Sequence, residues 1–270
     1  PDVPGDFRVA YLYRDLPEGS AVFGREKWLA ILGRFIHLEK KNGRESLIFP
    51  RYQQLDAVTK LLAHARRHGP GHSYLIQHSA GSGKSNTIAW SAHQPITLHD
   101  EADRPIFDAV IIVTDRIVLD RQLQDTVAQF GQTAGVVKKI DGTSRQLRQA
   151  IQQGARIIIT TIQKFPFIID GIADLSDRRF AVIIDEAHSG QSGIAHDNMN
   201  RAMGAGDVDP DEDDPQERIL AAMRSRKMRG NASYFAFTAT PKNTTLEKFG
   251  EPQPDGSFRP FHLYSMKQAI

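Results

Sequence analysis

Short, continuous runs of apolar residues recur along the chain, without the alternation of apolar and polar positions that marks a half-exposed strand. The runs cover residues 74–76, 109–113, 156–159, 180–184 and 234–237. Runs of this length that are rich in Val and Ile are typical of strands buried on both faces of a parallel sheet. The pattern therefore predicts a central, mostly parallel sheet.

Stretches with apolar residues at helical spacing lie between these runs, at residues 84–92, 119–130 and 144–153. Each would be a crossover helix that connects one parallel strand to the next. A chain in which strands and helices alternate places its helices on both faces of the sheet. We therefore expect an α/β fold built as a three-layer sandwich.

Two further helices are predicted ahead of the first strand. Apolar residues recur every three or four positions over residues 23–36, and Asn42-Gly43 then supplies a turn signal. Residues 52–68 repeat the helical pattern and end in a basic cluster, which suits the C-terminus of a helix.

The 270 residues are expected to form one large domain with extensions. We predict a leader segment with one helix over residues 1–50, the α/β domain over residues 51–241 and an exit segment over residues 242–270. The sequence begins at Pro1 rather than at methionine and ends at Ile270 without a polar tail. We expect it to be part of a longer protein.

Composition excludes several classes of function. Lys and Arg number 34 against 32 Asp and Glu, so any nucleic-acid contact must come from local patches rather than from an overall cationic excess. The absence of cysteine excludes disulfide scaffolds, thiolate nucleophiles and cysteine-containing zinc sites. No apolar run reaches the roughly 18 residues of a membrane helix, and no signal-peptide pattern opens the chain. We expect a cytoplasmic protein with no membrane partner.

One segment, residues 207–214, departs from the α/β pattern because it carries six carboxylates and a proline (DVDPDEDD). Its alternating aspartates are similar to a calcium-binding loop. However, Glu212 stands where the sharp turn of such a loop needs glycine, and Pro210 interrupts it. We interpret the segment as a solvated loop.

The sequence HSAGSGKS at residues 78–85 lies directly between a predicted strand and a predicted helix. Backbone amides at a helix N-terminus bind polyphosphate when glycines let the main chain come close, as Gly81 and Gly83 would. Lys84 would reach the β- and γ-phosphates, and the Ser85 hydroxyl would ligate the magnesium that bridges them. The general pattern has glycine where this chain has His78, so the motif alone leaves open a simple turn followed by a surface lysine.

The predicted strand at residues 180–184 ends in two adjacent carboxylates, Asp185 and Glu186. At the carboxyl edge of a parallel sheet this strand end would lie beside the phosphate loop. Asp185 would hold the hydrated magnesium, and Glu186 would orient and deprotonate the attacking water. The alternative is an acidic strand end that faces solvent.

Three motifs together resemble the first RecA-like domain of a superfamily 2 helicase. They are GSGKS as motif I, the DEAH box at residues 185–188 and Thr238-Ala239-Thr240-Pro241 as motif III. The resemblance implies a RecA-like P-loop NTPase fold with ATP and Mg²⁺ as cofactors. It also implies that His188 couples the nucleotide site to Thr238 and Thr240; the alternative is a histidine that caps a loop. The nucleotide-binding residues that the resemblance implies are Gln54, Ala80, Gly81, Ser82, Gly83, Lys84, Ser85 and Asn86.

Further segments are similar to the motor subunit of type I restriction enzymes. They lie at residues 50–58, 77–78, 113–120, 160–165 and 264–266. The similarity as a whole spans about residue 23 to the end. That subunit pumps duplex DNA past a stationary methyltransferase complex and cuts the DNA elsewhere. The resemblance implies the same task here, with double-stranded DNA and the methyltransferase and specificity subunits as partners.

The same resemblance assigns roles to individual residues. Gln54 matches the family glutamine that recognises adenine; the alternative is a surface glutamine on a helix, because Gln53 is equally polar. Hydroxyls, amides and cations after two of the strands would contact DNA phosphates. These predicted DNA contacts are Thr114, Asp115, Arg116, Thr160, Thr161, Gln163 and Lys164. The alternative for each is a polar residue in a solvated loop.

Two parts of such a motor are not found in this sequence. Glu39-Lys40-Lys41 fits the E-x-K triplet of the family nuclease, but it immediately precedes a turn and we interpret it as a solvated charge run. We expect the nuclease domain upstream and a second RecA-like domain, with arginine fingers, downstream. An arginine finger contributes about 10³–10⁵ in rate, so this chain alone should bind ATP yet hydrolyse it slowly.

The predicted function is an ATP hydrolase that translocates duplex DNA within a type I restriction complex. Two alternatives remain open. One is another superfamily 2 enzyme, such as an RNA helicase or a chromatin-type remodeller. The other is a nucleotide-gated nucleic-acid-binding module that never cycles, for which Glu186 would be dispensable.

Overall fold

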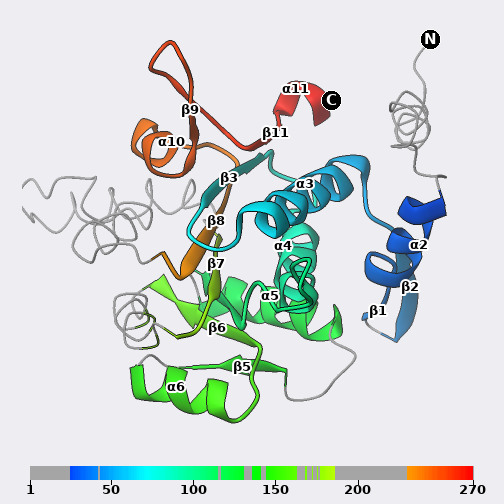
Figure 1. The fold of residues 1–270 in the computed structure, drawn as a ribbon. Helices are drawn as coiled ribbons and strands as arrows, with labels where there is room; N and C mark the ends of the chain where they lie inside the picture. The colour runs from blue at the N-terminus through cyan, green and yellow to red at the C-terminus, as the bar shows by residue number, and fades with distance from the viewer. Residues whose placement is uncertain are drawn as a thin grey trace, which may run out of the picture.

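The computed structural model describes residues 25–41, 43–114, 117–130, 136–140, 144–162, 177–185 and 230–269, together with Ile168, Ile172 and Leu175. Within these residues, seven strands form a central sheet in the order β11-β3-β8-β7-β4-β6-β5 (Figure 1). Every neighbouring pair of strands in this sheet is parallel. The strands are β3 (Ser73–His78), β4 (Ala109–Thr114), β5 (Val137–Lys139), β6 (Ile157–Thr161), β7 (Phe180–Asp185), β8 (Ala232–Thr238) and β11 (His262–Tyr264).

Helices cover both faces of this sheet (Figure 1). On one face lie α3 (Tyr52–His68), α4 (Lys84–His93) and α5 (Ile117–Phe130), and on the other lie α6 (Ser144–Gln152) and α10 (Asn243–Phe249). Successive residues of a strand point to opposite faces. In β4, for example, Val110 and Ile112 belong to the core under α3, α4 and α5, whereas Ile111 and Val113 belong to the core under α6 and α10. The predicted α/β class and three-layer sandwich are confirmed.

Two strands of the sheet had no apolar run to predict them, β5 and β11. Each has only three residues, and each lies at an edge of the sheet, where one side has no strand neighbour. Edge strands are often short and mixed in polarity because they are only partly enclosed. β11 comes from residues 242–270, so the sheet extends into the segment that was predicted to lead out of the domain.

Helix α2 (Arg25–Arg34) and a hairpin of β1 (His37–Lys41) and β2 (Arg44–Ile48) precede the sheet. They are anchored to α4, since Trp90 Nε1 donates to the Phe35 carbonyl at 3.0 Å and the Gln94 side chain donates to the Arg34 carbonyl at 3.3 Å. The helix is as predicted, but the hairpin is not. Residues 39–41, which the sequence suggested as a solvated charge run, form the second half of β1.

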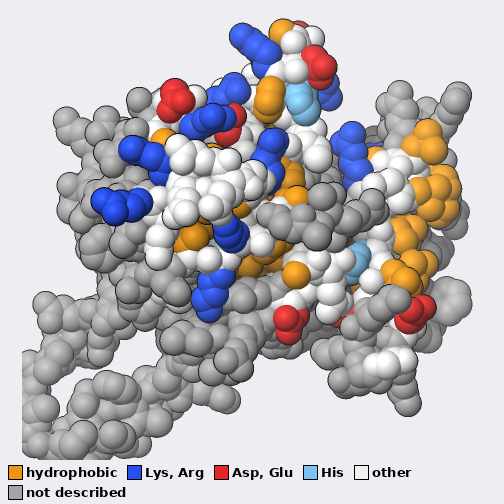
Figure 2. Space-filling model, turned by 90° about the horizontal axis from the view of Figure 1, so that it is seen from below, with side chains coloured by type: hydrophobic (Ala, Val, Ile, Leu, Met, Phe, Trp, Pro, Cys, Tyr) orange, Lys and Arg blue, Asp and Glu red, His pale blue; other side chains and the backbone are white. Residues whose placement is uncertain are grey.

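Hydrophobic side chains gather along the right-hand edge of the molecule in Figure 2, where α2 and the hairpin lie in Figure 1. The exposed apolar side chains of this region are Leu29, Leu32, Leu38, Leu47 and Phe49. The remaining described elements are η1 (Pro95–Thr97), the β9 (Glu251–Pro252) and β10 (Phe258–Arg259) pair, and α11 (Met266–Ala269). Among the helices described, none is long and apolar enough to cross a membrane. The acidic segment at residues 207–214 lies outside the described residues.

Candidate nucleotide-binding site

The carboxyl ends of four neighbouring strands bring the predicted site together. Gln77 of β3 is opposite Thr238 of β8, and Asp185 of β7 is opposite Phe237 of β8. On its other side, Asp185 is opposite Thr114 of β4. The phosphate loop, the acidic strand end and the Thr238–Thr240 segment therefore share one edge of the sheet, which is where parallel α/β sheets bind ligands.

The phosphate loop, residues 79–83, joins β3 to α4 and depends on its glycines. Gly81 and Gly83 have φ values of +76° and +80°, in the left-handed region that favours glycine. A Cβ atom added at Gly83 would lie only 2.5 Å from the Gln54 amide nitrogen. Helix α4 begins directly after Gly83, so the positive end of its dipole adjoins the loop. Around this turn Ala80 and Ser85 are exposed, Asn86 is half-buried and Ser82 is buried.

Lys84 and Asp185 form an ion pair across the site. The Lys84 Nζ atom lies 3.4 Å from Asp185 Oδ1, and the two side chains are 17% and 13% exposed. Lys84 begins α4, which follows β3, and Asp185 ends β7; β8 lies between these two strands, so the fold rather than sequence proximity brings the two side chains together. The predicted phosphate-binding cation and the predicted metal-binding carboxylate are thus within reach of the same triphosphate.

The site offers a magnesium ion oxygen ligands from the protein but not a complete coordination shell. Among the described residues, no group of three or more His, Cys, Asp or Glu side chains could hold a metal by itself. The Ser85 hydroxyl and the Asp185 carboxylate are hard oxygen donors of the kind that Mg²⁺ prefers, and Mg²⁺ usually completes its shell with waters and substrate phosphates. The residues present therefore fit a nucleotide-bound magnesium.

Gln54 contacts the phosphate loop rather than solvent. Its side chain is buried, its Nε2 atom donates to the Gly83 carbonyl at 2.9 Å, and its Oε1 atom accepts from the Arg51 amide at 2.8 Å. Gln53 supports the loop in the same way by donating to the Ser82 carbonyl at 3.3 Å. The alternative of a surface glutamine is wrong. Because both ends of the Gln54 amide are bonded to main chain, adenine recognition by this residue stays a prediction.

The segment after β8 is hydrogen-bonded to β3, the strand that leads into the phosphate loop. Gln77 Nε2 donates to the Ala239 carbonyl at 3.4 Å, and the Thr240 amide donates to Thr238 Oγ1 at 3.3 Å. Thr238 is buried and Thr240 is exposed. Gln77 therefore connects β3 to the segment that follows β8. Nothing in the sequence pattern predicted this contact. Glu186 and His188 lie outside the described residues.

A family model described as SWI2/SNF2 ATPase matches residues 53–270. The chain belongs to the SWI2/SNF2 ATPase family. The matched region contains the phosphate loop, Asp185 and β11. ATP use, predicted from the phosphate loop, is confirmed at the level of the family, and the domain is an ATP-hydrolysing enzyme.

Individual relatives of this SWI2/SNF2 ATPase are restriction enzymes. The chain is 29% identical over 237 residues to the type I restriction enzyme SauCOLORF180P endonuclease subunit of Staphylococcus aureus, covering 83% of this chain and 21% of the relative. It is 26% identical over 254 residues to the putative type I restriction enzyme MjaIXP endonuclease subunit of Methanocaldococcus jannaschii, covering 86% and 20%. The resemblance stated from the motifs is confirmed. The chain spans about a fifth of the length of the curated relatives it matches.

Two solved structures are similar to the domain. The UvsW helicase from bacteriophage T4 has a TM-score of 0.47 at 15% identity, over 87% of this chain and 64% of that one. A nuclease-deletion mutant of the type ISP restriction-modification enzyme LlaGI, in complex with a DNA substrate mimic, has a TM-score of 0.46 at 15% identity, over 81% of this chain and 18% of that one.

The predicted DNA contacts of the SWI2/SNF2 domain are only partly described. Asp115, Arg116, Gln163 and Lys164 lie outside the described residues. Thr114 and Thr160 are each 1% exposed, and the Thr114 hydroxyl donates to the Thr160 carbonyl at 3.5 Å. Contacts of these two hydroxyls with a DNA backbone are therefore not supported by their placement, because both side chains are buried in the sheet. Thr161, at the end of β6, is half-buried.

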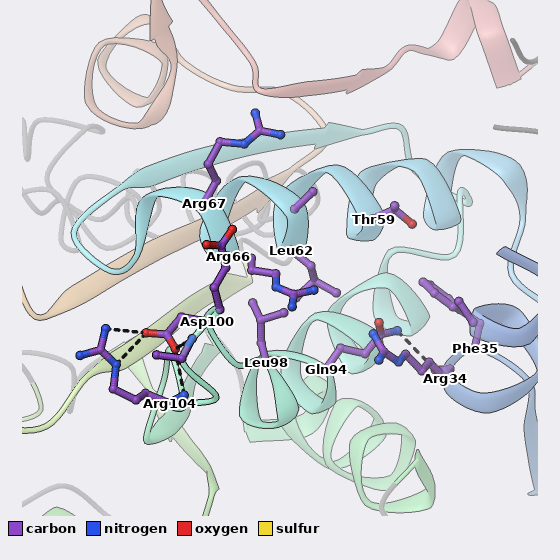
Figure 3. A pocket seen from close by; sticks show the side chains of 14 residues that line it. Arg34, Phe35, Thr59, Leu62, Arg66, Arg67, Gln94, Leu98, Asp100 and Arg104 are labelled. Carbon is purple, nitrogen blue, oxygen red and sulfur yellow. Dashed lines mark hydrogen bonds and ion pairs between the residues drawn. The ribbon is translucent and has the colours of Figure 1, made fainter. Parts of the chain in front are cut away.

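A cavity of about 860 Å³ lies away from the phosphate loop (Figure 3). It is bordered by α2, the C-terminal half of α3 and the segment that follows η1, and arginines surround it: Arg34, Arg66, Arg67 and Arg104. Arg104 is paired with Asp100 at 2.9 Å. None of the residues that line this cavity belongs to the phosphate loop, so it is separate from the nucleotide site of the ATPase.

We expect the ATPase domain to lose stability as the pH falls below about 6.5. The folded state lowers the pKa of His78 to about 3, mainly by burial and then through His262 and Lys84. Burial likewise lowers the pKa of His93. The unfolded chain therefore binds more protons in acid, so the free energy of unfolding decreases as the pH falls from 6.5 toward 3. For His78 alone the decrease is about 1.4 kcal/mol at pH 5.5.

Urea unfolding at pH 7.5, 6.5 and 5.5 measures this dependence. His78→Gln should flatten it, whereas His99→Gln, a change at a histidine of the segment after η1, should leave it as in the wild type. An unfolding free energy that stays constant over this range would contradict the prediction.

Proposed function

We propose that this chain is the ATP-driven motor region of a type I restriction enzyme endonuclease subunit and that it translocates double-stranded DNA. The observation that carries the proposal is the Lys84–Asp185 pair, which joins the phosphate loop to the acidic strand end at one edge of the sheet. The similarity to two endonuclease subunits supports the restriction context. The methyltransferase and specificity subunits of such a complex are the proposed partners.

In this proposal the chain's own residues bind and orient ATP. The amides of the phosphate loop surround the phosphates, and Lys84 places its charge on the β- and γ-phosphates. When bound, Mg²⁺ supplies further positive charge there, held by Ser85 and Asp185. Glu186 orients the attacking water and takes its proton.

DNA contact is proposed for the loops that follow β4 and β6. Asp115 and Arg116 follow β4 in the sequence, and Gln163 and Lys164 follow β6 closely; both strands end at the carboxyl edge that also carries the nucleotide site. The Arg116 guanidinium, the Gln163 amide and the Lys164 ammonium suit phosphate oxygens, which fix position without reading sequence. Coupling to ATP would use His188, Thr238 and Thr240, with the Gln77 contact to Ala239 as a described part of that route.

Hydrolysis of ATP by the full-length protein, measured with duplex DNA, single-stranded DNA and RNA, tests the substrate. Duplex DNA should give the largest stimulation. Stimulation by RNA alone would instead favour an RNA helicase. Glu186→Gln should retain ATP binding and lower hydrolysis by about 100-fold or more, as loss of a catalytic base does. Unchanged hydrolysis in that variant would favour a nucleotide-gated binding module.

A further inference from the structure

Three side chains from distant parts of the sequence form a hydrogen-bonded chain beside the phosphate loop. Asp56 of α3 accepts at its Oδ2 atom from His262 Nε2 of β11, at 3.1 Å. His262 Nδ1 lies 3.0 Å from His78 Nε2, at the end of β3. Both histidines are buried, His78 completely.

The Asp56 carboxylate fixes the direction of its hydrogen bond with His262. Burial alone would raise the pKa of the Asp56 carboxyl, but hydrogen bonds from His262 and Lys60 outweigh it and lower that pKa. An ionised carboxylate only accepts, so His262 Nε2 carries a hydrogen. His262 Nδ1 and His78 Nε2 share the second hydrogen bond, and in the tautomer that holds the His262 hydrogen on Nε2, Nδ1 accepts from the Nε2 hydrogen of His78. Asp56 thereby orients His262, and His262 orients His78.

The main chain continues this link into the loop. Tyr264 of β11 is opposite His78 in the sheet, and its carbonyl accepts from the Ser79 amide, the first residue of the phosphate loop, at 3.0 Å. At the other end of the loop, Gln53 and Gln54 of α3 bond the carbonyls of Ser82 and Gly83. The loop is therefore held from both ends by α3 and β11, and the Asp56–His262 bond joins these two elements.

We propose that Asp56, His262 and His78 are positioning residues that couple strand β11 to the start of the phosphate loop. This proposal rests on ATP binding at that loop. The Nδ1 atom of His78 is buried and has no hydrogen-bond partner among the described residues. A shift of β11 would break the bond between His262 and His78 and leave the second ring nitrogen of His78, Nε2, unpaired as well, which is costly. β11 is a three-residue edge strand paired only with β3 among the described strands. Movement of the chain that follows β11 would thus reach the nucleotide site by this route.

Two substitutions at His262 separate positioning from packing in the full-length protein. His262→Phe keeps a ring of similar size but removes both hydrogen bonds, whereas His262→Asn is smaller and keeps an acceptor near His78. We expect His262→Phe to raise the Kd for a fluorescent ATP analogue about tenfold, the effect of about one lost hydrogen bond. We expect His262→Asn to bind more tightly than His262→Phe. If the site only needed filling, the order would be reversed.

The control is Leu263→Ala, on the same strand but with an exposed side chain, which should bind the analogue as the wild type does. Hydrogen exchange supplies a second readout: the Ser79 amide should exchange faster in His262→Phe, while the amides of β4 stay protected. If His262→Phe does not fold, Asp56→Leu decides by the same measurements, since the Asp56 side chain is 43% exposed.

A folded His262→Phe protein with the wild-type Kd and unchanged Ser79 amide exchange would overturn the proposed coupling of β11 to the phosphate loop. Failure of the wild type itself to bind the analogue would be a different result. It would refute the proposed function on which this coupling rests, whatever Kd the variants show.

Discussion

Replacing Lys84 with alanine is expected to abolish ATP-driven activity of the full-length protein, with hydrolysis reduced by at least about 10²–10³. The Lys84 ammonium lies 3.4 Å from Asp185 Oδ1, at the start of α4 and next to the loop amides. Its removal takes positive charge away from the phosphates and exposes them to the Asp185 carboxylate. Weaker binding of ATP and slower hydrolysis should therefore appear together.

The fold should survive this change, because alanine is well tolerated in a helix and the Lys84 side chain packs in neither hydrophobic core. Circular dichroism and the unfolding midpoint check this. Lys138→Ala, an exposed lysine on β5 at the far edge of the sheet, is the matched control and should retain activity. If Lys84→Ala binds a fluorescent ATP analogue as well as the wild type does, the phosphate-loop assignment is wrong.

The strands that sequence predicted are those enclosed by protein on every side. All six residues of β4 and of β7 are buried, and such strands must be apolar throughout. β11 shows why others were missed: His262 and Tyr264 are buried but Leu263 is exposed, and three residues show no usable periodicity. The fold class therefore followed from the sheet centre, whereas the edge strands depended on neighbours that local pattern does not contain.

The site divides in the same way. Lys84 and the loop glycines were predictable because one contiguous motif sets the backbone that binds phosphate. The support of that loop by Gln53, Gln54 and His262 was not, because these residues are 28 to 184 positions away from the loop and strand residues that they bond. At the strand ends, the polar character of a residue did not indicate whether its side chain would be exposed or buried. Thr114 and Thr160 are buried, although hydroxyls also suit a phosphate contact.

Replacing Asp185 with asparagine is expected to remove most of the Mg²⁺ dependence of ATP binding and to lower hydrolysis about 100-fold or more, since even an indirect supporting group is worth 10–100-fold in metal affinity. Asparagine has nearly the same shape but lacks the charge that makes a carboxylate a good magnesium ligand. ATP affinity measured across a Mg²⁺ titration and in EDTA tests this. EDTA should weaken binding to the wild type and change binding to the variant little.

The affinity in EDTA also separates loss of the metal from damage to the phosphate loop. Asp185 places a negative charge 3.4 Å from Lys84, so its neutralisation should leave Mg²⁺-free ATP bound as tightly as before or more tightly. A damaged loop would instead bind ATP more weakly under both conditions. Asp125→Asn, an exposed change on α5, should respond to Mg²⁺ as the wild type does. If Asp185→Asn does so too, another carboxylate holds the metal.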